Sequence, residues 1–400
     1  MSSDPETTPR SIQPVRAQST GTGRERYTQI DLMKAAAITL VILDHTITHS
    51  VRTTVFPYFW ELTSVPLFMV IMGFNMANSL RADSKNPLRE SYSREYLRKK
   101  TNRYLVPFLY VYAVGLALSL LSGLLNVELV SSLGVLPFWG PGMWFLPIVL
   151  TAVFVLPALY RVFLWKPKLT VAACFLTDLA QYLAMYILFP GWPTDAWLES
   201  AVRFVLFCSV TIYLFPISLG FWFSQNHGLR DRHNYFVYMA FFLSLSYLLA
   251  YEFFGFRLFF IPDVGAEYNP MVIPYSAFLF LLGMRFLPTK GGRKTTRALA
   301  TTGKASYHIL NVQNLYFSTE YALFPFLLTV GLADNALLYL PLFAVNAASC
   351  SLLGAVWFML DSSRKQLRAN KQGGHRSQPL GPVDIARSRR EEWQADAHDC

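Results

Sequence analysis

Apolar stretches of the length needed to cross a membrane recur along the whole chain. A spanning helix needs roughly 20 apolar residues, and ten such stretches fall at residues 30–49, 59–80, 104–125, 143–163, 169–189, 201–223, 235–252, 271–287, 305–324 and 336–360. Only 15% of the residues are charged and 53% are hydrophobic, which is too apolar a composition for several soluble domains. We therefore expect an all-α polytopic membrane protein, with about ten transmembrane helices in one bundle formed by residues 29–362.

The two ends of the chain differ from this bundle in composition. Residues 1–28 and 363–400 are rich in polar and charged residues and contain too few apolar ones to fold alone, so we expect two disordered tails. The chain has 35 lysines and arginines, and nearly all of them lie in these tails and in alternate loops. The exceptions are Lys34, Arg52, Arg203 and Arg257. This asymmetry predicts a multi-pass protein of the cell membrane with both termini in the cytosol. It also explains the net charge of +10 without a nucleic-acid partner.

The first predicted span, "DLMKAAAITLVILDHT" (residues 31–46), contains ionisable residues. Eleven residues separate Lys34 from His45, and at about 100° and 1.5 Å per residue the two share one face, about 16 Å apart. Asp31 and His49 extend that face, whereas Asp44 is expected to point about a quarter turn away from His45. Because such groups are costly in lipid, the face is expected to turn toward protein or water.

Two interpretations of this face remain open. In the structural one, Asp31 and Lys34 form an ion pair at the membrane surface while His45 hydrogen-bonds a neighbouring helix. In the chemical one, His45 acts as a general base toward a hydroxyl group, and Lys34 neutralises a phosphate or a developing anion. The second arrangement is typical of acyl transfer from a phosphate-bearing carrier.

The same residues resemble acyltransferase family 3, whose membrane proteins O-acylate cell-surface glycans and other small hydroxylated molecules. The first span of that family has a basic residue, ten intervening residues and a histidine, in a segment such as "DLLRALAILLVVLGH". Here the segment reads "DLMKAAAITLVILDH", with Lys34 and His45 at the two positions. Lysine stands where arginine is commoner in the family, and Asp44 where a small or apolar residue is usual.

Four further segments are similar to the family in the same order along residues 30 to about 320. They are "VPLFMVIMGF" (residues 65–74), "YLRKKTNRYLVP" (96–107), "MWFLP" (143–147) and "GKASYHILNVQ" (303–313). The resemblance implies an integral-membrane O-acyltransferase, specifically an acetyltransferase. Acyl-CoA would be the donor, with no permanently bound cofactor, and the acceptor would be a hydroxyl of a cell-surface glycan or another small hydroxylated molecule, such as a lipid-linked sugar.

Basic residues at the start of the third span are candidates for binding the phosphates of coenzyme A. These residues are Arg98, Lys99, Lys100 and Arg103, and we assign Tyr307 to the donor as well. Guanidinium and ammonium groups bind phosphates strongly. Positive-inside anchoring of the helix explains the same basic cluster equally well.

On the ninth span, Tyr307, Asn311, Asn314 and Ser318 recur at helical spacing. They are expected either to line a central cavity or to join helices by hydrogen bonds. In the first case Asn311 and Asn314 would contact the acceptor.

Three candidates lie toward the outer side. Glu61 could orient the imidazole of His45, as acids do in other acyl-transfer sites. Trp144 and His49 could contact a sugar-like acceptor. The alternative is an ordinary carboxylate at the edge of a helix and an interfacial aromatic belt.

Other functional classes find less support. A proton-coupled transporter could use Asp31, Lys34, Asp44 and His45 as a relay, and it remains the alternative to the enzyme. A metal site is not predicted, because we identify no Asp-x-Asp motif and no His-Cys cluster. There is no P-loop and no Gly-x-Ser-x-Gly segment. Cys174, Cys208 and Cys350 fall within predicted spans and show no spacing typical of disulfides.

Overall fold

The computed structural model describes residues 27–46, 56–83, 92–121, 144–188, 206, 208–258, 269–323 and 336–374. All regular elements among these residues are helical. The long helices are α1 (Thr28–Thr46), α3 (Glu61–Asp83), α6 (Val106–Leu121), α8 (Phe145–Trp165), α9 (Pro167–Leu188), α11 (Leu214–Ser224), α12 (Tyr235–Phe254), α13 (Ile273–Phe286), α14 (Lys294–Leu323) and α16 (Ala336–Gly374). Shorter elements are η1 (Pro57–Phe59), α5 (Arg94–Lys100), η2 (Thr101–Leu105), η3 (Val210–Tyr213) and η4 (Arg232–Asn234).

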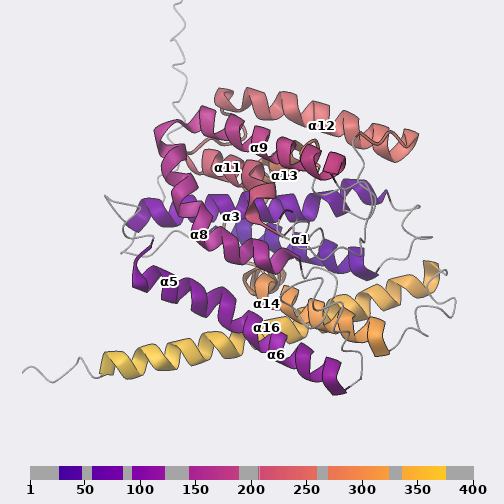
Figure 1. Cartoon of the computed structure of the whole chain (residues 1–400). Helices are drawn as coiled ribbons and strands as arrows, with labels where there is room; N and C mark the ends of the chain where they lie inside the picture. The colour runs from indigo at the N-terminus through magenta and orange to yellow at the C-terminus, as the bar shows by residue number, and fades with distance from the viewer. Residues whose placement is uncertain are drawn as a thin grey trace, which may run out of the picture.

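The helices form one bundle with α1 and α3 at its centre (Figure 1). Helix α12 lies at one edge of the bundle in this view, and α6 and α16 lie at the opposite edge. Helix α3 packs most extensively against α11, while α1 packs against α14, which in turn packs against α16. The start of α1 contacts the second half of α3, where the rings of Tyr27 and Phe74 are 5.6 Å apart.

Glycines allow the closest helix crossings in the bundle. A Cβ atom added at Gly73 would overlap the backbone of Ile217, and one added at Gly220 would overlap the backbone of Val70. Gly303 on α14 lies in the same way against the backbone of Asp31 on α1. Small residues at such crossings are typical of helices packed in a membrane, where close van der Waals contact drives association. The glycine of the "GKASYHILNVQ" segment thus fixes α14 against α1.

The outer faces of several helices are apolar and exposed. Large hydrophobic side chains of this kind include Leu176 on α9, Phe242 and Leu243 on α12, and Leu352 and Leu353 on α16. Five described helices are long and apolar enough to cross a membrane, at Pro57–Arg81, Phe145–Trp165, Pro167–Ile187, Arg232–Phe254 and Leu340–Lys365. An exposed apolar surface around a helical bundle is the form expected in lipid. The protein is therefore a helical membrane protein.

Two helices extend beyond the predicted spans. Helix α14 begins at Lys294, ahead of the predicted span at residues 305–324. Helix α16 continues to Gly374, so residues 363–374 are helical rather than disordered. Lys365 Nζ lies 2.6 Å from Asp361 Oδ2 one turn earlier, a spacing that supports an exposed helix. Of the predicted N-terminal tail, only Tyr27 and Thr28 are described, and Thr28 begins α1. Residues 1–26 and 375–400 lie outside the described residues.

The third helix contains a widened turn where its basic residues enter the bundle. Ser93 caps α5 by accepting a hydrogen bond from the backbone N–H of Tyr96. Residues Thr101–Leu105 then form the π-helical turn η2, in which the N–H of Val106 donates to the carbonyl of Thr101. Pro107 follows directly and has no N–H to donate. Such turns are frequent at functional sites, and this one carries Arg103.

Candidate active site

A cavity of about 1010 Å³ lies between α1, α3, α5, η2, α8 and α14. This volume is at the upper end of the range typical of small-molecule sites. Its middle is apolar, lined by side chains such as Ile38, Phe68, Ile71, Val149 and Leu156. Polar and charged side chains line both ends. The cavity can therefore hold a long ligand with a polar group at each end.

The ionisable residues of α1 line this cavity together. Asp31, Lys34 and His45 are all in its wall, as their helical spacing predicts. The prediction that Asp44 points away is wrong, because Asp44 also lines the cavity and its Oδ2 lies 3.8 Å from His45 Nδ1. Successive residues of a helix are about 100° apart, but a cavity this wide spans both directions.

The imidazole of His45 is partly buried at the end of α1. About 20% of its side chain is exposed, and its ring lies 6.0 Å from that of Phe317 in an edge-on arrangement. Glu61 and Ser64 at the start of α3, and Trp144 before α8, line the same cavity. A histidine held between an apolar ring and an open cavity can take a proton from a ligand and return it.

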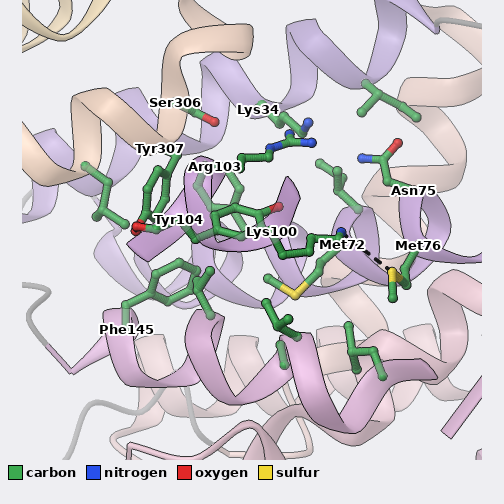
Figure 2. Close-up of a pocket in the computed structure, with 18 of the residues that line it drawn as sticks. Lys34, Met72, Asn75, Met76, Lys100, Arg103, Tyr104, Phe145, Ser306 and Tyr307 are labelled. Atoms are coloured by element: carbon green, nitrogen blue, oxygen red, sulfur yellow. Dashed lines mark hydrogen bonds between the residues drawn. The ribbon is translucent and has the colours of Figure 1, made fainter. Parts of the chain in front are cut away.

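Three cations surround Tyr104 at the other end of the cavity. The Arg103 guanidinium carbon is 5.3 Å and the Lys100 Nζ is 5.8 Å from the centre of the Tyr104 ring. Lys34 is also close enough to act electrostatically on this tyrosine. Figure 2 shows Lys34 and Arg103 reaching from two different elements into the same part of the cavity. Converging positive charges of this kind are suited to phosphate groups.

Tyr307 links α14 to the widened turn. Its hydroxyl donates a hydrogen bond of 2.7 Å to the backbone carbonyl of Tyr104, and the two rings meet edge to face at 5.2 Å. Helix α3 also contacts this region, because Lys100 Nζ lies 3.9 Å from Met76 Sδ on α3 (Figure 2). Contacts from α3 and α14 thus position the residues on α5 and η2.

The remaining predicted site residues occupy different places. Lys99, Glu61 and Trp144 line the cavity. Arg98 is exposed and is not among the lining residues, and we do not carry it into the site. Asn311 and Asn314 are fully buried but do not line the cavity. His49 lies outside the described residues.

Sequence reasoning did not identify several polar residues of the cavity. Asn75, Asn78 and Ser79 on α3 line the end that also holds the cations. Asn78 Nδ2 is buried and has no hydrogen-bond partner within the described parts of the chain, so it is available to a ligand. Polar residues near the end of an otherwise apolar span were a signal that could have found them. Tyr104 carried no comparable signal.

A second polar cluster lies away from this cavity, between α11 and α12. His227, Asp231 and His233 offer ligand atoms that all lie within 4.8 Å of one another. The sequence analysis predicted no metal site and did not single out this grouping, which could hold a metal ion. The three residues are close in sequence, and the spacing His-x₃-Asp-x-His was the missed signal.

Comparison with known protein families identifies the family of this chain. The family model of the acyltransferase domain, acyltransferase family 3, matches residues 27–360. No curated protein and no solved structure matched the chain. The matched region extends from the start of α1 into α16 and includes every helix that lines the cavity. The chain belongs to acyltransferase family 3.

Proposed function

We propose that this membrane acyltransferase transfers an acetyl group from acetyl-CoA to a hydroxyl of a glycan or lipid-linked sugar. The observation that carries the proposal is that Lys34 and His45 line one cavity, with Lys100 and Arg103 beside Lys34. One end of the cavity therefore suits phosphates, and the other holds a group that can act as a base. Family membership supports the acyl-transfer chemistry.

The donor would enter from the end that holds the cations. Lys34, Lys100 and Arg103 would bind its phosphates, and the apolar middle of the cavity would hold the pantetheine arm. The arm has to cover about 16 Å between the levels of Lys34 and His45 on α1. An extended thioester donor satisfies this requirement, whereas a small anion alone does not.

His45 would act as the general base. Its imidazole removes the proton of the acceptor hydroxyl, and the oxygen attacks the carbonyl carbon of the thioester. The C–S bond then breaks, and the departing thiolate takes the proton from the imidazolium. The Asp44 carboxylate, 3.8 Å from His45 Nδ1, would stabilise the imidazolium between these two steps. The reaction releases free coenzyme A and the O-acetyl product.

The acceptor would approach from the end near Trp144 and Glu61. An indole at the cavity wall can stack against a sugar face, and a carboxylate can accept hydrogen bonds from sugar hydroxyls. With both termini in the cytosol, as the distribution of basic residues predicts, this end faces the outside of the cell membrane. Such an arrangement carries an acyl group from a cytosolic donor to an outer acceptor.

Release of coenzyme A from acetyl-CoA tests the proposal. In membranes containing His45→Gln, the acceptor-dependent rate of coenzyme A release should fall by at least about 100-fold, which is the usual size of a general-base contribution. His308→Gln is the matched control, because His308 lies on α14 and does not line the cavity. Equal rates in His45→Gln and wild type would reject the proposal. Substrate flux in proteoliposomes without release of coenzyme A would favour the transporter instead.

A further inference from the structure

The connection between α11 and α12 brings three metal-ligating side chains to one point. His227 Nδ1 lies 2.5 Å from Asp231 Oδ2, and His233 Nδ1 lies 2.7 Å from Asp231 Oδ1. Both imidazoles therefore present the same nitrogen to the two oxygens of one carboxylate. The side chains are between about one fifth and one half exposed, so an ion can reach them from solvent.

The backbone of this connection is held in place independently of the three side chains. Asn234 is fully buried and donates hydrogen bonds to the carbonyls of His227 and Gly228. Its own Oδ1 accepts the indole N–H of Trp222 at 2.9 Å. Asn226 adopts a positive φ of 67°, a conformation that asparagine tolerates better than most residues. The loop is therefore organised before any ion binds.

The orientation of the ligands is also fixed. The ring of His227 stacks on Trp222 with centroids 4.4 Å apart. Asp231 accepts the backbone N–H of His233 at 2.9 Å and so caps η4. Contacts that orient a ligand and are not themselves bound to the metal are a regular feature of metal sites.

The charges around Asp231 favour its role as an anionic ligand. Its two oxygens accept hydrogen bonds from the rings of His227 and His233 and from the backbone N–H of His233. Arg230 and Arg232 are its sequence neighbours, yet in the described structure neither forms a salt bridge with it. The carboxylate instead faces the two imidazoles.

We propose that His227, Asp231 and His233 bind a divalent transition-metal ion of the zinc type. Two imidazoles and a carboxylate are a ligand set that suits such ions. Ligand atoms about 2.0–2.2 Å from zinc in a tetrahedral site are roughly 3.4 Å apart, so small side-chain rotations separate the present atoms far enough. The ion would replace the hydrogen bonds that now join the two imidazoles to the Asp231 carboxylate. It would thereby link the end of α11 to the start of α12.

One coordination position would remain available to solvent or to an anion. His227 and His233 also line a second cavity of about 480 Å³, together with Trp165, Lys166 and Lys168. Three protein ligands with an open fourth position are the pattern of zinc sites that exchange a ligand. This site is separate from the acyl-transfer cavity and does not depend on the proposed function.

Zinc binding to the full-length protein tests the proposal. The protein, purified in detergent without a polyhistidine tag and stripped with EDTA, is loaded with Zn²⁺, and zinc per chain is measured by mass spectrometry. Affinity is measured by competition with a chromophoric chelator. We expect one zinc per chain in the wild type. Asp231→Asn and His233→Gln should each weaken zinc binding by more than about tenfold. Loss of a residue that only supports a ligand already lowers metal affinity by at least about that much.

Matched variants separate a lost ligand from a disturbed loop. Asp231→Asn keeps an oxygen that can still cap η4, and helix content by circular dichroism should be unchanged. Arg232 is exposed and is not a proposed ligand. Arg232→Gln removes a positive charge next to the proposed zinc site, so this variant should bind zinc at least as tightly as the wild type. Cobalt should give visible d–d absorption in the wild type and not in Asp231→Asn. Wild-type protein that binds no zinc, or ligand variants that bind it as the wild type does, would overturn the site.

Discussion

The Tyr307 hydroxyl donates a 2.7 Å hydrogen bond to the carbonyl of Tyr104, across the gap between α14 and η2. This bond holds the π-helical turn that carries Arg103, and so connects the late "GKASYHILNVQ" segment to the basic residues of the third helix. A change at Tyr307 should therefore act on donor binding through the position of the turn.

Replacing Tyr307 with Phe should raise the KM for acetyl-CoA by about fivefold and change kcat little. The estimate corresponds to the net worth of one hydrogen bond, about 1 kcal/mol. Tyr316→Phe is the control, because it removes a comparable bond of 2.9 Å to Asn346 away from the cavity. Steady-state kinetics in membranes with varied acetyl-CoA check this, and equal effects of the two variants would contradict it.

The three cations around Tyr104 should matter for coenzyme A and not for shorter donors. Lys100→Ala and Arg103→Ala should each lower kcat/KM for acetyl-CoA by about tenfold or more, since hydrogen bonds to charged groups contribute about 1.5–3 kcal/mol. Transfer from acetyl-pantetheine, which has no phosphate, should change little. Arg98→Ala should leave both donors unaffected, because Arg98 is exposed and outside the cavity. Similar losses with both donors would argue against phosphate binding at this end.

The crossing of α1 and α14 should tolerate no side chain at Gly303. A Cβ there overlaps the backbone of Asp31, and overpacking of this kind typically costs about 1–3 kcal/mol. Gly303→Ala should lower the thermal unfolding midpoint in detergent and reduce transfer, because α1 carries Lys34 and His45. Gly292→Ala meets no atom within 4 Å and should match the wild type. An unchanged midpoint in Gly303→Ala would show that the helices separate easily.

Asp178 should be needed for the fold rather than for chemistry. This buried carboxylate on α9 accepts the backbone N–H groups of Leu214 and Phe215, at 3.1 and 3.0 Å, where α11 begins. Asp178→Ala leaves the buried N–H of Phe215 and the partly buried N–H of Leu214 unpaired, and a buried unpaired donor costs about 1–3 kcal/mol. We expect less folded protein and a lower unfolding midpoint. The exposed neighbour Thr177→Ala should show neither effect, and equal midpoints in the two variants would contradict this role.

Helical periodicity was enough to predict the central feature of the site. Lys34 and His45 share the cavity because eleven residues return a helix to nearly the same direction. Periodicity was misleading for Asp44, since it says nothing about the width of the space that a helix faces. Hydropathy predicted ten spans, and five of the described helices are long and apolar enough to cross a membrane. It could not show that α16 extends to Gly374, beyond the exposed ion pair of Asp361 and Lys365.

Other parts of the site depend on features that a linear pattern does not contain. The π-helical turn between Lys100 and Val106 changes the helical phase, so the sequence could not show that Arg103 lines the cavity while Arg98 does not. In the separate cluster of His227, Asp231 and His233 the spacing was visible in the sequence, but the convergence of the side chains depends on a loop shaped by Asn226 and Asn234. Neither of these asparagines has a diagnostic pattern in sequence.

Affinity labelling with bromoacetyl-CoA tests the central claim most directly, because it reports which side chain lies at the acyl group of a bound donor. The imidazole of His45 should displace bromide and become alkylated, and peptide mass spectrometry should find the label there. Excess acetyl-CoA should prevent labelling, and Arg103→Ala should slow it. Labelling that spares His45 and falls on residues outside the cavity, unaffected by acetyl-CoA, would contradict the account.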